Sequence, residues 1–259
     1  MKLNNIIKQY KETAKLRQMQ YIQDQDGIAR RYQREKQNWD LHFTSSKEFI
    51  LKSAETKNKG KLVVLGSGWL FDLPIKELSK QFKEIVLIDI IHPKQVLKKI
   101  KSFDNVTTIK ADITDGLIDF FYNNVKQKNS LNITNLSSFS FDIPEADFVI
   151  SLNIMCQLHI ILIDYMKKFN KYSSSELNKI EQQIQQSHLN ILPKGKTCLI
   201  TDFEEEIYDE KENLIGVNPL IKVALPTENF MLKWQWKFDS NMTYREDSKT
   251  FFNTMALDF

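Results

Sequence analysis

Short apolar segments that are rich in β-branched residues recur along the chain from residue 61 onward. Each segment ends in polar residues or in glycine. Strands that are apolar throughout are buried on both faces, which is typical of parallel sheets. The pattern predicts sheet strands at residues 61–66, 84–90, 105–112, 147–153 and 196–203.

Segments with helical periodicity lie between these strands, at residues 73–82, 93–103 and 173–192. Ser173 and Glu176 have the spacing of a capping box, which predicts that the last of these helices begins there. Alternating strands and helices predict an open sheet with helices on both faces. The expected fold class is therefore α/β: a Rossmann-like, doubly wound and mostly parallel sheet.

The two ends of the chain follow other patterns. Residues 1–38 are polar with apolar positions at helical spacing, and Gly27 is expected to separate two helices. Thr44 or Ser45 is expected to cap a further helix. Residues 228–241 and 248–259 are rich in aromatic residues and predict a pair of antiparallel strands, with one aromatic face covering the sheet core.

This organisation divides the chain into two parts. Residues 1–58 form a helical extension, which we interpret as a lid or substrate cover, and residues 59–259 form the Rossmann-like domain. Residues 127–142 are rich in Asn and Ser and predict a polar surface insertion before the fourth strand.

Composition limits the function classes. The 259 residues include 36 basic and 33 acidic side chains, a balance too even to indicate nucleic-acid binding. Cys156 and Cys198 lie in apolar segments without a Cys/His cluster, so we expect buried thiols and no metal site. The first residues lack an apolar signal core and no segment reaches membrane-spanning length, so we expect a cytoplasmic protein.

Candidate chemistry gathers where the predicted strands end. Gly66 and Gly68 follow the first strand, and glycine there allows a backbone to approach a ligand closely. Asp89 ends the second strand, where a carboxylate can accept hydrogen bonds from both hydroxyls of a ribose. Asp112 follows the third strand, and Ser151 and Asn153 end the fourth.

These motifs, "VVLGSG", "VLIDI", "ADIT" and "DFVISLNIMCQL", resemble class I S-adenosylmethionine-dependent methyltransferases over about residues 60–205. The sequences of these motifs are also similar to those of bacterial methyltransferase-like proteins of unassigned activity. The resemblance implies S-adenosylmethionine as cofactor, with Asp89 at the ribose and Asp112 near the adenine amino group. It implies that the cofactor is held by Leu65, Gly66, Ser67, Gly68, Asp89, Ile90, Asp112, Ile113, Ser151 and Asn153.

The sequence departs from the family pattern at two positions. Val64 replaces the usual acidic residue before the first glycine, and Leu70 replaces the third glycine. A dinucleotide-binding loop is disfavoured because Phe71 would crowd a pyrophosphate at the place of its third glycine. Neither a nucleobase-amine motif nor a nucleophilic cysteine motif is present.

Methyl transfer requires an acceptor held in line and, for many acceptors, a base. The candidate catalytic residues are His159 after the fourth strand, Asp202 at the end of the fifth, and His42 in the extension. The leading hypothesis is a methyltransferase acting on a small-molecule or peptide-like acceptor. The alternatives are a catalytically inactive fold that serves as an interaction module, and an RNA-modifying enzyme that binds through the basic residues 29–36. The acceptor and the oligomeric state stay open.

Overall fold

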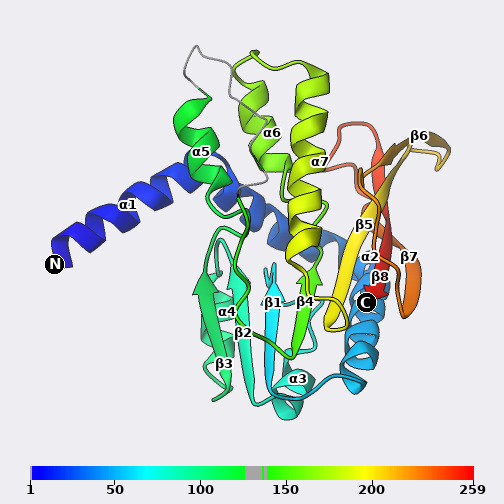
Figure 1. The fold of residues 1–259 in the computed structure, drawn as a ribbon. Coiled ribbons are helices and arrows are strands. Elements are labelled where there is room, and N and C mark those ends of the chain that lie inside the picture. The colour runs from blue at the N-terminus through cyan, green and yellow to red at the C-terminus, as the bar shows by residue number, and fades with distance from the viewer. Residues whose placement is uncertain (1, 126–135, 137–138) are drawn as a thin grey trace.

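The computed structural model describes residues 2–125, 136 and 139–259. Within these residues eight strands form one sheet (Figure 1), in which seven strands have the order β3-β2-β1-β4-β5-β8-β7 and β6 pairs with β5. The strands are β1 (Lys61–Leu65), β2 (Glu84–Asp89), β3 (Val106–Lys110), β4 (Phe148–Leu152), β5 (Thr197–Tyr208), β6 (Leu214–Pro219), β7 (Phe230–Asp239) and β8 (Lys249–Asp258). The helices are α1 (Lys2–Gln18), α2 (Tyr21–Glu55), α3 (Ile75–Gln81), α4 (Lys94–Ile100), α5 (Leu117–Asn124), α6 (Ile160–Lys167) and α7 (Ser174–Ile191).

The first five strands are parallel, and β8 runs antiparallel between β5 and β7. The predicted α/β class, the parallel sheet and the antiparallel C-terminal strands are therefore confirmed. The chain reverses its direction of travel across the sheet between β1 and β4, and open α/β sheets bind ligands at such a switch point.

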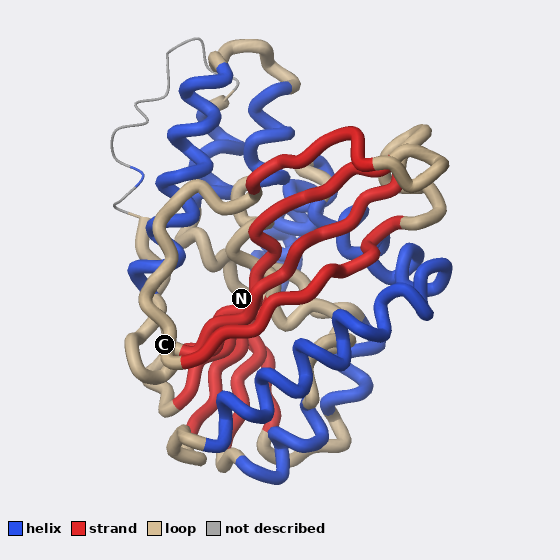
Figure 2. Tube along the Cα trace, turned by 90° about the vertical axis from the view of Figure 1, so that its right-hand side faces the viewer, coloured by secondary structure: helices blue, strands red, loops and turns tan. Residues whose placement is uncertain are grey.

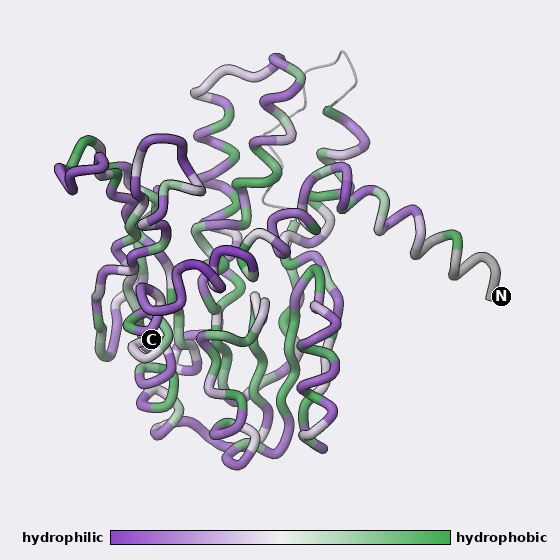
Figure 3. Tube along the Cα trace, turned by 180° about the vertical axis from the view of Figure 1, so that it is seen from behind, coloured by the Kyte–Doolittle hydropathy of each residue, from purple (hydrophilic) through white to green (hydrophobic). Residues whose placement is uncertain are grey.

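Both faces of the central strands are buried, as their continuous apolar sequences predict. Leu62 and Val64 of β1 pack in a cluster with α2, α3 and α4, whereas Val63 and Leu65 pack on the opposite face with residues from the end of α7. Hydrophobic residues follow the strands closely in the view from behind (Figure 3). The edge strand β3 is the exception, because one side of it has no partner and much of it is exposed.

The N-terminal helices differ from the prediction. Gly27 does not separate two helices, and neither Thr44 nor Ser45 caps one, because α2 runs unbroken through all three positions. The chain breaks at Gln20 instead, which has a left-handed φ of 78°. A glycine inside a helix costs only about 1 kcal/mol, and the buried stripe of α2 against β7 outweighs that cost (Figure 2).

Two further elements differ from the predicted ones. β5 continues to Tyr208 because it is paired by β8 on one side and by β6 on the other, so Glu204, Glu205 and Glu206 lie in a strand and not in a solvated loop. β6 itself was not predicted. The capping box of Ser173 and Glu176 is confirmed, and most of the predicted insertion at 127–142 lies outside the described residues.

Candidate functional site

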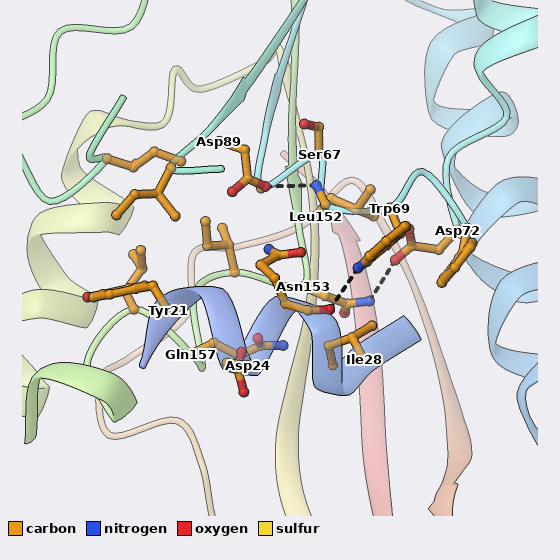
Figure 4. Close-up of a pocket in the computed structure, with 18 of the residues that line it drawn as sticks. Tyr21, Asp24, Ile28, Ser67, Trp69, Asp72, Asp89, Leu152, Asn153 and Gln157 are labelled. Atoms are coloured by element: carbon orange, nitrogen blue, oxygen red, sulfur yellow. Dashed lines mark hydrogen bonds between the residues drawn. The ribbon is translucent and has the colours of Figure 1, made fainter. Parts of the chain in front are cut away.

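A cavity lies beyond the carboxyl ends of β1, β2, β3 and β4 and is closed on one side by α2 (Figure 4). Its walls combine residues that are remote in sequence, because the strand ends and the long helix meet only in the folded chain. The residues that line it are Tyr21, Asp24, Gln25, Ile28, Trp39, His42, Phe43, Gly66, Ser67, Gly68, Trp69, Phe71, Asp72, Asp89, Ile90, Ala111, Asp112, Ile113, Thr114, Ile118, Leu152, Asn153, Ile154, Gln157, Leu158, Ile161 and Trp236.

The loop after β1 requires its glycines. Gly66 has a φ of +77°, and a Cβ there would lie 2.9 Å from the carbonyl oxygen of Leu152. Gly68 has a φ of +46°, and a Cβ there would meet no atom closer than 4.0 Å. The position of the missing third glycine keeps a left-handed backbone, since Leu70 has a φ of 57° while its side chain is buried in the core. The loop has thus kept its conformation without the third glycine.

Asp89 connects the glycine loop to the second strand. Its carboxylate accepts hydrogen bonds from the backbone N–H of Gly68 at 2.7 Å and of Ile91 at 3.3 Å. Burial raises the pKa of Asp89, and these backbone hydrogen bonds oppose that rise. A carboxylate has about four acceptor positions, so two remain for a ligand in the cavity.

Asp112 has a different role in the structure from the one the sequence suggested. Its two oxygens accept from the backbone N–H groups of Thr114, Gly116 and Ile118 and from the Thr114 hydroxyl at 2.5 Å. Four donors occupy the acceptor positions of this carboxylate. Asp112 therefore organises the turn that begins α5, and its contact with an adenine amino group stays a prediction.

Three of the predicted cofactor residues behave differently from one another. Ser67 is 1% exposed, and its hydroxyl has no hydrogen-bond partner although the residue lines the cavity. Ser151 turns away from the cavity, and its hydroxyl lies 2.8 Å from Nε2 of His188 on α7. Leu65 is buried in the core on the α7 side. Of the three, only Ser67 belongs to the described cavity lining.

His42 and Asn153 meet at the end of the cavity nearest β7. His42 is fully buried, stacks on Trp236 with ring centroids 3.9 Å apart, and accepts a hydrogen bond at Nδ1 from Trp234 at 3.2 Å. Its Nε2 lies 3.0 Å from the side-chain nitrogen of Asn153. Burial lowers the pKa of His42 to about 3, so this imidazole is neutral. With both ring nitrogens in contact with protein groups, His42 supports the cavity wall.

Asn153 holds Asp72 in place. Its Nδ2 donates to the Asp72 carboxylate at 3.0 Å, while its Oδ1 is buried without a partner (Figure 4). Asn153 has a φ of 48°, a left-handed conformation that Asn tolerates better than most residues. Burial raises the pKa of Asp72, and the hydrogen bond from Asn153 opposes that rise.

Neither of the other catalytic candidates lines the cavity. His159 lies at the start of α6 and pairs through Nε2 with Glu181 of α7 at 3.1 Å. Asp202 is buried in β5, where the Thr254 hydroxyl donates to it at 2.5 Å. Burial, with a smaller contribution from the charge of Asp72, raises the pKa of Asp202 to about 7. Their catalytic roles stay predictions without a contact to the cavity.

Sequence reasoning missed the contribution of α2 and of the residues after the glycine loop. Tyr21, Asp24, Gln25 and Ile28 occupy one side of the first turns of α2 and face the loop (Figure 4). Trp69 joins the two, because its Nε1 donates to the carbonyl oxygen of Gln25 at 2.9 Å. The unusual aromatic residue directly after Gly68 was the one local signal of this contact.

Among the described residues, no group of three His, Cys, Asp or Glu side chains could hold a metal ion. Both cysteines are free and buried. No helix in the described part of the chain is long and apolar enough to cross a membrane.

No family model and no curated protein matches the sequence. Several solved structures are similar. The N-methyltransferase NodS from Bradyrhizobium japonicum, in complex with S-adenosyl-L-homocysteine, is 10% identical over 83% of this chain and 86% of its own, with a TM-score of 0.37. A methyltransferase from Clostridium acetobutylicum, described as S-adenosylmethionine-dependent, is 14% identical over 68% of this chain and 57% of its own, with a TM-score of 0.38. Similarity at these sequence identities and TM-scores does not establish an activity for this chain.

Proposed function

We propose that the protein is an S-adenosylmethionine-dependent methyltransferase that acts on a small-molecule or peptide-like acceptor. The observation that carries the proposal is the buried carboxylate of Asp89 on the cavity wall, fixed by Gly68 and with acceptor positions to spare. A carboxylate at the end of the second parallel strand is placed to accept hydrogen bonds from the two hydroxyls of a ribose.

The other residues of this end of the cavity fit an adenosyl group. The left-handed backbone at Gly66 and Gly68 leaves room for a ligand to approach the main chain closely. The hydroxyl of Ser67 is without a hydrogen-bond partner among the described residues, and a polar ligand could supply one. Ile90, Ala111 and Ile113 provide apolar contact for a flat base. When bound, the cofactor supplies an electrophilic methyl group, whose C–S bond breaks toward sulfur as the acceptor lone pair forms the new bond.

The protein's own contribution is to position the acceptor and exclude water. Asn153 lies between the cofactor end of the cavity and the end formed by His42, Asp72, Phe71 and Trp236. His42 acts as a positioning residue in this proposal, because it is neutral and its Nδ1 already accepts a hydrogen bond from Trp234. The residue that faces the acceptor with a titratable oxygen is Asp72.

Calorimetric titration with S-adenosyl-L-homocysteine tests the proposal. We expect saturable binding to the wild type, and a loss of about tenfold or more in Asp89→Asn, which keeps the shape but loses acceptor capacity. Asp164→Asn is the matched control, since Asp164 is exposed on α6 and is not one of the residues that line the cavity. Absence of binding to the wild type at millimolar ligand would overturn the proposal.

The inactive interaction module is the second hypothesis, and a separate arm distinguishes it. Transfer of a labelled methyl group to small amines, alcohols and acids would support the enzyme. Cofactor binding without transfer to any of these acceptors would favour the inactive module.

A further inference from the structure

The end of the cavity beyond Asn153 differs in chemical character from the end beside the glycine loop. The inference drawn from it rests on the proposed function only for the identity of the cofactor. We infer that this end binds a cationic amine, so that the acceptor is an amine-bearing small molecule with an apolar or aromatic body. Asp72 contacts the ammonium group, and the aromatic rings around it contact the body.

The first support is the balance of charge in the cavity. Its described lining includes the carboxylates of Asp24, Asp72, Asp89 and Asp112 but no lysine or arginine, although the chain as a whole carries a net charge of +3. The one imidazole in the lining, that of His42, is neutral. An acceptor that bears a carboxylate or phosphate would therefore find no counter-charge in these walls.

The second support is that two of these carboxylates, those of Asp89 and Asp112, are held mainly by backbone donors of the adjacent loops, whereas that of Asp72 is less occupied. Asp89 is held by backbone N–H groups beside the glycine loop, and Asp112 is fully engaged by its own turn. Asp72 accepts from one side-chain amide, that of Asn153, and remains partly open, with 17% of its side chain exposed. Asp72 also accepts from its own backbone N–H, and these two donors leave part of the acceptor capacity of the carboxylate unused.

The third support is a pair of buried acceptors without donors. Oδ1 of Asn153 and Oε1 of Gln25 are both buried and unpartnered, and both residues line the cavity. An unpaired buried carbonyl oxygen is unfavourable unless a ligand supplies an N–H or O–H. An ammonium group is a donor at every one of its protons, so it can supply the donors that these two oxygens lack.

The fourth support is the aromatic wall around Asp72. Trp69 stacks on Phe71 at 5.9 Å between centroids, and Phe71 lies 5.8 Å from Phe43. Trp236 closes the far side over His42. Aromatic faces attract cations through the ring quadrupole, in addition to the attraction by the carboxylate.

The nearby cations of the protein do not fill this end. Lys47 acts on Asp72 from α2 but is not part of the lining, and its Nζ lies over the ring of Phe43. Arg31 acts on Asp24, and its guanidinium lies over the ring of Phe238, 4.5 Å from the centroid. An amine that enters with its proton is converted to the nucleophilic free base by passing that proton to the Asp72 carboxylate, which becomes a neutral acid.

Three ligands of matched shape test the inference: 3-phenylpropylamine, 3-phenylpropanol and 3-phenylpropionate. Each is titrated calorimetrically at low salt into protein saturated with S-adenosyl-L-homocysteine. We expect the amine to bind at least about tenfold more tightly than the alcohol and the acid. Asp72→Asn, which keeps the side-chain shape, should remove this preference, whereas Asp164→Asn should keep it.

The outcomes separate the two proposals. Equal or tighter binding of the acid or the alcohol, or no binding of the amine at millimolar concentration, overturns the amine inference and leaves cofactor binding untouched. Failure of S-adenosyl-L-homocysteine to bind overturns the proposed function, and the amine titration is then read on the free protein by the same comparison. An amine preference that survives in Asp72→Asn also overturns the inference, because another group would then recognise the cation.

Discussion

The backbone N–H of Gly68 donates to the carboxylate of Asp89 at 2.7 Å and thereby fixes the glycine loop of β1 to the end of β2. The bond joins the loop that follows β1 to the last residue of the adjacent parallel strand β2, beside the switch point between β1 and β4. It holds in place a carboxylate that is 5% exposed and lines the cavity. The relationship makes the loop and the acid one unit, and it sets the first prediction.

Gly66→Ala and Gly68→Ala should differ in their effects on the stability of the fold and on the affinity for S-adenosyl-L-homocysteine. Both residues have positive φ, which costs an alanine about 1–2 kcal/mol. Only Gly66→Ala adds a clash, with Ile154 and the Leu152 carbonyl, which costs a further 1–3 kcal/mol or so. In urea denaturation, Gly66→Ala should be the less stable variant. Gly68→Ala should instead lose mainly affinity for S-adenosyl-L-homocysteine; equal stability of the two variants would contradict this geometry.

Trp69→Phe and Trp236→Phe form a matched pair, because the same ring atoms are removed from both. The N–H of Trp69 donates to Gln25, whereas the buried N–H of Trp236 has no partner. We expect Trp69→Phe to be the more destabilising change, by about 1 kcal/mol relative to the other. Hydrogen exchange at residues 21–28 should also accelerate in Trp69→Phe alone. If the first turns of α2 exchange equally in both variants, Trp69 does not hold α2 to the loop.

Two buried histidines should make the protein sensitive to acid. Burial lowers the pKa of His42 to about 3 and of His188 to about 4, from an ordinary value of 6.5. Between pH 6.5 and 4 the unfolded chain binds these protons and the folded chain does not, so the unfolding free energy falls as pH falls. Each histidine contributes about 1.4 kcal/mol per pH unit to that slope. Urea denaturation across this range measures it, and His188→Gln should flatten the slope by about one proton.

Asp202 should act in the opposite direction. Its pKa is raised by burial to about 7 from an ordinary value of 3.8, so between these values the folded chain binds a proton that the unfolded chain lacks. This contribution stabilises the fold as pH falls from 7 and is lost as pH rises through 7. Asp202→Asn should therefore steepen the acid slope of the same urea series by about one proton. An unchanged slope would mean that Asp202 is ionised in the fold.

The pair Arg245 and Glu205 offers a fifth prediction. Arg245 donates to both oxygens of Glu205, at 2.7 and 2.8 Å, and Glu205 is 5% exposed. Arg245→Gln leaves this carboxylate buried with a weaker partner and should destabilise the protein by about 3 kcal/mol. The double variant that also carries Glu205→Gln should recover part of the loss in thermal unfolding. A double variant less stable than the single one would show that the ion pair is not the cause.

The sequence was sufficient to predict where the parallel strands end. Continuous apolar segments specify parallel strands, and parallel strands place their carboxyl ends at one edge. Gly66, Gly68, Asp89 and Asn153 therefore come together wherever such a sheet forms, and all four line the cavity. The role of each toward a ligand stays a proposal.

The sequence could not indicate which residues from distant elements would complete the site. Asp72 and Asp24 are ordinary acidic residues in their local context, and only the packing of α2 on β7 and across the loop brings them to the same cavity. Gln157 and Trp236 reach the cavity in the same way. The side chains of Ser151 and Asp112 make tertiary and turn contacts that the local sequence did not indicate, and their predicted contacts with a cofactor stay predictions.

The sequence by itself determined the parallel sheet, the glycine loop and the acid at the end of β2, because each is specified by periodicity and backbone conformation over a few neighbouring residues. The tertiary structure decided which face of α2 closes the cavity, that His42 is buried and neutral, and that Asp72 lines the cavity. Those features depend on which surfaces meet when the apolar stripe of α2 is buried, and no local pattern encodes that meeting.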